Sequence, residues 1–304
     1  MQLTPSKVSL VIDMIFSDNI NLLKGLAITV LNQADIDTYF RQGYIVLSEY
    51  FSLEQMAMLK SAALKIVDDF DPESTRSVFS TKTADTARDQ YFLTSGDKVR
   101  CFFEEQAFAD DGSLKQSKRL SINKIGHALH ALSPEFSNFC QSSEIGDIAR
   151  SLGVSSPEIR QSMYIFKQPK IGGEIRWHQD ASYFMTQPMS VITFWLAIED
   201  ATLLNGCLKV DKQGVDFPLK EQFRRYPDDA TELVTLSNRA WPSENQALPL
   251  EVKAGSLVLF NGNLPHYSEA NRSNKSRHAF TLHITSADAL YDKYNWLQAN
   301  PVKV

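Results

Sequence analysis

The sequence has few cysteines, no excess of positive charge and no long apolar run, and each shortage excludes a class of protein. Its three cysteines, Cys101, Cys140 and Cys207, are far apart and form no Cys-x-x-Cys pair. A disulfide framework is therefore disfavoured, and a reducing compartment is expected. The net charge of −5 gives no reason to expect nucleic acid as a partner, because that needs a basic patch. No apolar run reaches the ~18 residues of a membrane-spanning helix.

The first residues do not look like a targeting signal. Asp13 and Asp18 break the mildly apolar start, and a basic segment before it is nearly absent. We therefore expect no secretory signal and no membrane partner. The last residues, Pro-Val-Lys-Val, differ from the Ser-Lys-Leu peroxisomal address. A cytoplasmic location is the expectation, and the sequence leaves the oligomeric state open.

Composition and periodicity predict one folded domain with an extension before it. A hydrophobic content of 43% and a charged content of 22% are those of a protein with an ordinary core. Residues 1–32 show no clear period and form an extension of uncertain structure, whereas residues 33–304 are predicted to form a single domain. Within it, residues 71–98 are polar and predict a long loop.

Capping residues mark the predicted helices. The segment from Ala34 to Gln42 is followed by Gly43, a common residue just after a helix. Ser52 and Gln55 form a capping box ahead of an apolar stripe that continues to Phe70. A further helix is predicted over 144–152, before Gly153. These are packing helices rather than functional motifs.

Strand patterns dominate after Arg160. Segments rich in β-branched and aromatic residues, separated by turn residues, lie at 160–168, 191–199, 206–210, 255–260 and 277–285. Two of them alternate between an apolar face and a mixed face, which suits a sheet with a partly polar interior. We predict an α+β, mainly β fold: a double-stranded β-helix, which is a cupin-like jelly roll, with helices of the N-terminal half packed against it.

Two histidines and one aspartate predict a metal centre. His178 and Asp180 form a His-x-Asp pair, and residues i and i+2 of a strand point to the same side. His266 follows a Gly- and Pro-containing turn after another apolar strand. Two imidazoles and a carboxylate are the ligand set of non-haem Fe(II) oxygenases. A lone His-x-Asp is more often a surface pair, and the second half of the pattern favours the metal.

Arg277 is the predicted anchor for an anionic co-substrate. Residues 271–276 are typical of a hairpin turn, so Arg277 would return on the strand next to that of His266. A buried guanidinium needs a carboxylate, which it binds through two hydrogen bonds. A dicarboxylate co-substrate would supply it, and Ser268 could donate a further bond. The alternative for Arg277 is a structural salt bridge.

Other histidines and one arginine are expected to be structural. His127 and His130 have no partner at metal-ligand spacing. His278 and His283 differ in strand parity, and His283 is expected at most to border the cavity. Arg100 could hold a substrate carboxylate, although stacking on an aromatic ring is the preferred interpretation.

Several segments of the chain resemble the phytanoyl-CoA dioxygenase family over about residues 33 to 300. They are Ser121–His130, Gln161–Pro169, Gly172–Glu174, His178–Ser182, Trp195–Thr202 and Asn205–Leu208. The resemblance implies a double-stranded β-helix enzyme that uses Fe(II), 2-oxoglutarate and O2, with ascorbate as an added reductant. It implies iron ligation by His178, Asp180 and His266. It also implies contacts to 2-oxoglutarate from Lys124, Met163, Trp195, Ser268 and Arg277.

The implied reaction is hydroxylation of a C–H bond of a small molecule, with release of succinate and CO2. Because Asp180 is present, oxygen insertion is favoured over the halogenation that relatives with a small residue there perform. Desaturation, cyclisation or demethylation by the same iron chemistry, or a silent ligand-binding jelly roll, remain alternatives. Residues 209–214 depart from the Pro-Gly-Ser-His turn usual in the family. Because this segment borders the substrate opening in such folds, the departure affects the substrate rather than the metal.

Overall fold

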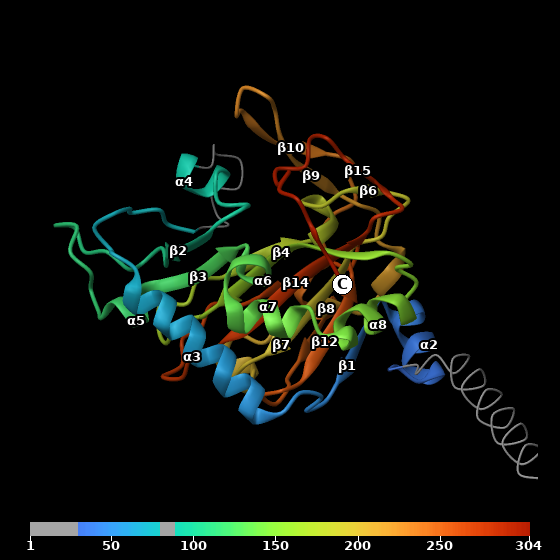
Figure 1. The fold of residues 1–304 in the computed structure, drawn as a ribbon, viewed down its shortest axis with the longest axis horizontal. Helices are drawn as coiled ribbons and strands as arrows, with labels where there is room; N and C mark the ends of the chain where they lie inside the picture. Colours follow the sequence, from blue (N-terminus) through green and yellow to red (C-terminus); the bar gives the residue numbers. More distant parts are fainter. Residues whose placement is uncertain (1–29, 80–88) are drawn as a thin grey trace, which may run out of the picture.

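The fold is that of a computed structural model, which describes residues 30–79 and 89–304 (Figure 1). The helices are α2 (Gln33–Gln42), α3 (Leu53–Asp69), α4 (Gln90–Leu93), α5 (Lys118–Ser121), α6 (Leu129–Leu132), α7 (Pro134–Cys140) and α8 (Ser143–Ser151). None of the described helices is long and apolar enough to cross a membrane.

The predicted caps are present at the predicted helices. Gly43, predicted to follow the first helix, comes just after α2 with a φ of 81°; the Asn32 side chain, which was not predicted as a cap, accepts a hydrogen bond at the start of α2. Ser52 and Gln55 form both bonds of the capping box that begins α3. Gly153, after α8, has a φ of 90°. The local signals therefore identified these helices to within one residue of their starts.

A large antiparallel sheet forms the centre of the molecule. Its order is β1 (Tyr44–Leu47), β12 (Leu257–Asn261), β7 (Ile192–Ala197), β14 (Ala279–Ser286), β4 (Pro157–Ile165), β3 (Ile122–His127) and β2 (Val99–Phe103), with β16 (Val302–Lys303) also paired to β4. Each predicted strand segment that falls in this sheet contains a strand. β1 coincides with the short strand that the sequence indicates at Tyr44–Leu47. β2 and β3, however, also come from the N-terminal half, which is therefore not only helical as predicted.

A smaller sheet faces the large one. It contains β11 (Ala247–Leu250), β8 (Leu208–Asp211), β13 (His266–Ser268) and β5 (Ile175–His178). Two further strand pairs lie outside both sheets: β9 (Glu221–Arg225) with β10 (Thr231–Thr235), and β6 (Thr186–Gln187) with β15 (Leu290–Tyr291). Two facing antiparallel sheets are the double-stranded β-helix that the sequence predicted.

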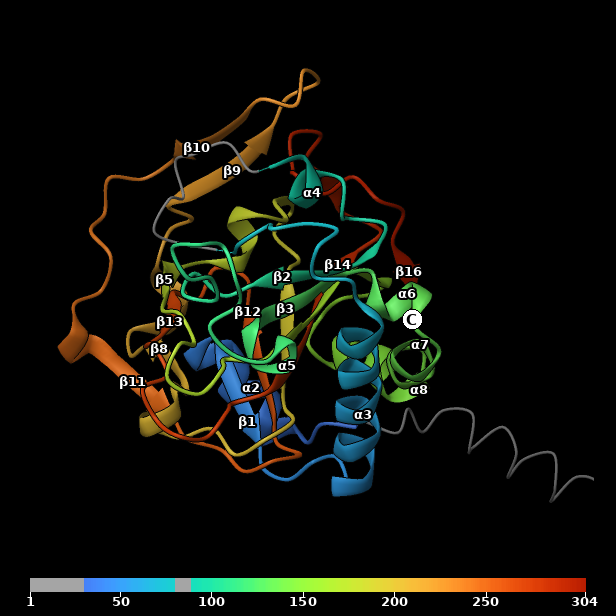
Figure 2. The ribbon, with the colours of Figure 1, turned by 90° about the vertical axis from the view of Figure 1, so that its left-hand side faces the viewer.

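The two faces of the large sheet have different partners. Figure 2 shows α3, α7 and α8 on one side of it and the small sheet on the other. On β7, Phe194 and Leu196 join the cluster that contains Met56 and Phe136 from the helices. Trp195, between them in sequence, joins the cluster between the sheets. The alternation seen in the sequence thus separates a helix-covered core from the interior of the jelly roll.

The predicted loop and extension fall partly outside the described residues. Of the loop at 71–98, residues 80–88 lie outside them, and 90–93 form α4 rather than loop. Of the extension, residues 1–29 lie outside them, whereas Leu31 is buried in the core and Asn32 caps α2. The division into an extension and a single domain stays a prediction.

Candidate metal centre and adjoining cavity

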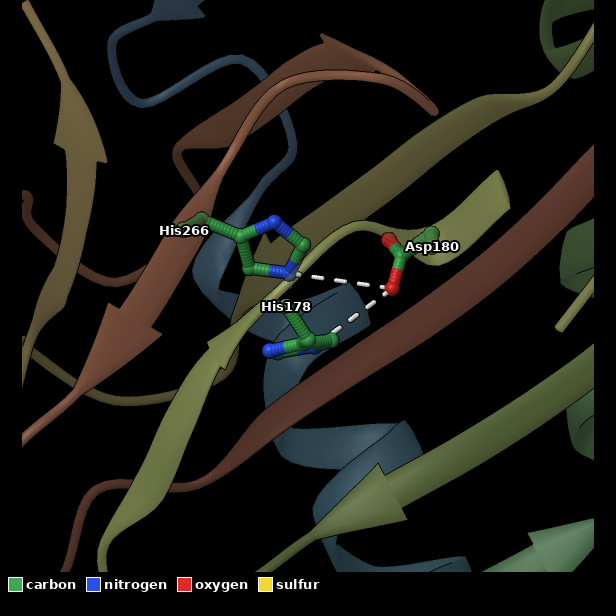
Figure 3. A group of neighbouring side chains, drawn as sticks. All are labelled: His178, Asp180 and His266. Carbon is green, nitrogen blue, oxygen red and sulfur yellow. Dashed lines mark ion pairs between the residues drawn. The ribbon is translucent and has the colours of Figure 1, made fainter. Parts of the chain in front are cut away.

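Three side chains from the small sheet and its flanking turn converge between the two sheets. His178 ends β5 and His266 begins β13, and these two residues face each other in the antiparallel register. The Nε2 atoms of His178 and His266 lie 3.6 and 3.7 Å from Oδ1 of Asp180 (Figure 3). One ligand atom from each residue lies within 4.8 Å of the others. This donor set fits a ferrous ion.

Asp180 reaches the cluster from a turn and not, as predicted, from the same strand as His178. β5 ends at His178, and Asp180 begins a 3-10 helix over Asp180–Ser182. The Ser182 amide donates to the Gln179 carbonyl at 3.0 Å, and the Tyr183 amide donates to the Asp180 carbonyl at 2.9 Å. Strand parity therefore does not apply to Asp180, and the turn brings its carboxylate back beside His178.

Both imidazoles are oriented by backbone carbonyls. Nδ1 of His178 lies 2.9 Å from the Arg176 carbonyl oxygen, and Nδ1 of His266 lies 3.0 Å from that of Leu264. Because a carbonyl only accepts, each Nδ1 carries the proton, and each Nε2 lone pair is left for a metal. Burial, with a smaller effect of His266, lowers the pKa of His178 to about 3. The His178 imidazole is thus neutral and ready to ligate at neutral pH.

The two oxygens of Asp180 have different neighbours. Oδ1 faces the two ligand histidines, whereas Oδ2 accepts a hydrogen bond of 2.5 Å from the Thr193 hydroxyl and lies 3.4 Å from Nε2 of His283. Burial acts to raise the pKa of Asp180, but His266, His283 and His178 outweigh it and hold the pKa well below its usual value. The carboxylate is therefore ionised, and Thr193 fixes its rotation.

A cavity of about 140 Å³ adjoins the cluster and is lined by all three of its members. The side chains predicted to contact 2-oxoglutarate line the same cavity: Lys124 on β3, Met163 on β4, Trp195 on β7, Ser268 on β13 and Arg277 just before β14. The structure thus brings the predicted metal ligands and the predicted co-substrate contacts to one space. His283 also lines it, as the sequence allowed.

Arg277 is a buried cation without an acidic partner in the described part of the chain. Only 2% of Arg277 is exposed. Its Nε donates a hydrogen bond to the Gly206 carbonyl at 3.2 Å, and its Nη1 has no hydrogen-bond partner in the described residues. The guanidinium lies 5.3 Å from the centre of the Trp195 ring. Burial lowers the pKa of Arg277 to about 10, which still leaves it charged at neutral pH. The structural salt bridge considered from the sequence is not observed.

Arg277 reaches the cavity by a different route from the predicted one. β13, which carries His266, is paired with β5 and β8 in the small sheet. β14, which follows Arg277, is paired with β4 and β7 in the large sheet. Arg277 and His266 are therefore on facing sheets rather than on neighbouring strands, and the space between them is the interior of the jelly roll.

Lys124 lies on the same side of the cavity as Met163. Its Nζ is 3.6 Å from the Met163 sulfur and 3.3 Å from the centre of the Phe79 ring. Only 5% of Lys124 is exposed. A buried ammonium over an aromatic face is a favourable arrangement, and it leaves a second cation on the cavity wall.

Lys167 is the site residue that sequence reasoning missed. It is 1% exposed, and its Nζ donates to the Gly173 carbonyl at 2.7 Å and to the Ser268 hydroxyl at 2.8 Å. Strand parity does not reveal it, because Lys167 lies beyond the end of β4 at Ile165 and has a φ of 41°.

The remaining predicted structural residues have local partners. Nδ1 of His127 lies 2.7 Å from the Ser95 hydroxyl, and Nδ1 of His130 lies 2.8 Å from that of Ser162. Neither belongs to a metal-ligand cluster in the described residues. Arg100 stacks on an aromatic ring as preferred: its guanidinium lies 4.4 Å from the centre of the Tyr91 ring. Cys101, Cys140 and Cys207 are free and buried.

Comparison with known proteins decides the family. The family model described as phytanoyl-CoA dioxygenase (PhyH) matches residues 39–279, which is most of the chain. This chain belongs to the phytanoyl-CoA dioxygenase family. A phytanoyl-CoA dioxygenase of Arabidopsis thaliana is 42% identical over 271 residues, covering 88% of this chain and 94% of that protein. Phytanoyl-CoA dioxygenase domain-containing protein 1 of Danio rerio is 39% identical over 278 residues, covering 89% of this chain and 96% of that protein.

A solved structure supports the phytanoyl-CoA dioxygenase fold. EctD from S. alaskensis, crystallised with 2-oxoglutarate and 5-hydroxyectoine, matches with a TM-score of 0.60 and 20% identity over 91% of this chain and 86% of that one. At that identity the likeness shows the jelly-roll fold alone.

Thr193→Val should weaken metal binding by about tenfold, because the Asp180 carboxylate loses the donor that fixes its rotation. Calorimetric titration of the metal-free protein with Mn(II) would measure this. Thr281→Val is the matched control: Thr281 also lines the cavity, but its hydroxyl donates only to the Met163 carbonyl, at 3.5 Å. Equal effects of the two substitutions would contradict a role for Thr193 in orienting Asp180.

Proposed function

We propose that this protein is an Fe(II)- and 2-oxoglutarate-dependent oxygenase that hydroxylates a C–H bond of a small organic molecule. The observation that carries the proposal is the buried Arg277, whose Nη1 has no partner in the described residues, beside the cavity that His178, Asp180 and His266 also line. An isolated buried guanidinium is costly unless a carboxylate completes it. A dianion that chelates the metal at one end and binds the Arg277 guanidinium at the other satisfies both groups.

Each residue has a definite task in this proposal. His178, Asp180 and His266 would hold Fe(II), two as neutral imidazoles and one as a carboxylate. Bound Fe(II) and 2-oxoglutarate supply an oxidant made from O2, with release of succinate and CO2. Arg277 and Ser268 would bind the carboxylate at the far end of 2-oxoglutarate. Their burial strengthens these bonds, since water does not compete.

The other contacts would shape and dry the co-substrate half of the cavity. The Trp195 ring lies 5.3 Å from the guanidinium and limits the directions in which this planar group can turn. Lys124 and Met163 form the wall opposite the small sheet. On the remaining side, aromatic rings line the cavity, with Phe184 stacked 4.7 Å from His283. An apolar wall of this kind favours a substrate that presents carbon and hydrogen to the metal.

Succinate formation tests the proposal. Purified protein with Fe(II), ascorbate and 2-oxoglutarate should form succinate, and His178→Ala should abolish it because the metal loses a ligand. His130→Gln is the control, since His130 is buried and bonded to Ser162 but does not line the cavity. Absence of succinate from the wild type, or equal succinate from His178→Ala, would reject the proposal.

Product analysis separates the alternatives. A screen of metabolites for oxygen-dependent mass changes would show one added oxygen for hydroxylation. Desaturation or cyclisation would show the loss of two hydrogens, and demethylation the loss of a methyl group. A silent ligand-binding jelly roll would form no succinate with any substrate. The Asp180 carboxylate favours oxygen insertion over halogenation, and the product analysis distinguishes hydroxylation from the other reactions.

We also propose a cytoplasmic location, which rests on the absence of disulfides among the three cysteines. Fractionation of cells that carry the tagged protein would test it, and recovery in an oxidising compartment would contradict it.

A further inference from the structure

Lys167 is a buried lysine that belongs to no ion pair in the described residues. It lies two residues after the end of β4. All three hydrogen-bond acceptors of its Nζ are uncharged: the Gly173 carbonyl at 2.7 Å, the Ser268 hydroxyl at 2.8 Å and the Ser268 carbonyl at 3.4 Å. Burying an ammonium in this way is costly unless something compensates for its charge. The residue is therefore expected to have a task beyond packing.

The surroundings of Lys167 carry an excess of buried positive charge. Burial lowers the pKa of Lys167, and the positive charge of the nearby Arg277 lowers it further. Three acidic residues act in the opposite direction, but Glu174 and Glu269 are exposed. Only Glu104 is buried, and its Oε2 already accepts bonds from Asn123, at 2.8 Å, and from the Gly173 amide, at 3.1 Å. Two buried cations thus share one buried acid, and one negative charge is lacking.

The bond from Lys167 also decides what the Ser268 hydroxyl can do. An ammonium has donors only, so the Ser268 oxygen accepts from it. The single hydroxyl proton of Ser268 is then left for another acceptor. Ser268 and Arg277 line the same cavity, so an anion there receives the bond from Ser268 together with those from the guanidinium.

We propose that Lys167 is a positioning residue for the far carboxylate of 2-oxoglutarate, acting through Ser268. It makes Ser268 a donor, and it adds a buried positive charge behind Arg277. This inference rests on the proposed function and extends it, since it assigns to the co-substrate a further cation besides Arg277 and Lys124. An arriving carboxylate favours the ammonium form of Lys167, so that binding of the anion and the charge on Lys167 support each other.

Two keto acids separate this role from a structural one. 2-Oxobutanoate has the same keto-acid end as 2-oxoglutarate but no far carboxylate. Calorimetry on the Mn(II)-loaded protein would give the dissociation constant of each. We expect Lys167→Met to raise the dissociation constant of 2-oxoglutarate by roughly tenfold to a hundredfold, the usual range for a hydrogen bond to a charged group. The dissociation constant of 2-oxobutanoate should change by less than about twofold, because that ligand has no group for Lys167 to act on.

Lys118→Met is the matched control. The Lys118 Nζ donates hydrogen bonds to the Asp68 and Phe70 carbonyls, at 2.7 and 2.6 Å. Lys118 does not line the cavity, so neither dissociation constant should change. Lys167→Gln, which keeps a donor without the charge, serves if Lys167→Met does not fold. Equal weakening of both keto acids, or weakening of neither, would overturn the role of Lys167. If the wild type does not bind 2-oxoglutarate at all, the proposed function itself fails.

Discussion

Arg277→Met should leave a folded protein that binds Mn(II) normally and binds 2-oxoglutarate at least a hundredfold more weakly. The substitution removes the buried cation that faces the cavity, and losing one partner of a buried charged pair costs about 3 kcal/mol or more. The residue left behind fills most of the space beside Trp195, so packing changes little. Calorimetric titration with each ligand would measure the two effects separately.

Arg160→Met is the control for this experiment. Arg160 also stacks on an aromatic ring, with its guanidinium 4.0 Å from the centre of the Tyr291 ring. However, it is paired with Glu158 and does not line the cavity. The substitution Arg160→Met should therefore leave the dissociation constant of 2-oxoglutarate unchanged. If Arg277→Met binds 2-oxoglutarate as the wild type does, the co-substrate is held elsewhere and Arg277 is structural.

Phe280→Ala should lower the free energy of unfolding by about 3–5 kcal/mol. Phe280 is 1% exposed, and its ring lies 4.8 Å from that of Phe136 and 6.3 Å from that of Phe139, between centroids. Both partners are on α7, so the substitution leaves a cavity where the helix packs on β14. Urea unfolding followed by fluorescence would measure the loss, with the slope checked for two-state behaviour.

Phe40→Ala is the comparison for stability. Phe40 is 56% exposed, and an exposed side chain of this kind should cost less than about 1 kcal/mol. Because Phe280 faces the helices and not the cavity, Mn(II) binding by folded Phe280→Ala should stay close to that of the wild type. A loss similar to that of Phe40→Ala would mean that α7 does not depend on this contact.

The sequence predicted which residues gather at the site better than it predicted how they arrive. Asp180 and Arg277 were expected from strand parity and from a hairpin, and both expectations were wrong about the route. The residue types still predicted correctly that both side chains reach the site, because a guanidinium and a carboxylate are stable inside a protein only where a partner charge or a metal ion is available. The backbone path depends on turn bonds, such as that from Ser182 to Gln179, which no periodicity reveals.

Local signals and long-range pairing differed in the same way for the fold. Caps at Ser52 and Gly43 involve residues close in sequence, so they could be identified directly. β2 and β3 pair with each other and extend the sheet from β4, a result of contacts between distant segments. Lys167 was missed for a further reason: a lysine is expected at the surface, and only its packing in three dimensions shows that it is buried.

The hydrogen bond from Thr193 to Asp180 ties β7 of the large sheet to the turn after β5 of the small one. The Asp180 carboxylate is therefore held by a direct link between the two sheets, and not by the loops at their rims. Of residues 209–214, the first three belong to β8 and pair with the strand of His266, so variation that leaves the reacting groups in place is confined to the residues after Asp211. A new substrate could be accommodated by altering the rim alone, while the oxidative machinery keeps its alignment.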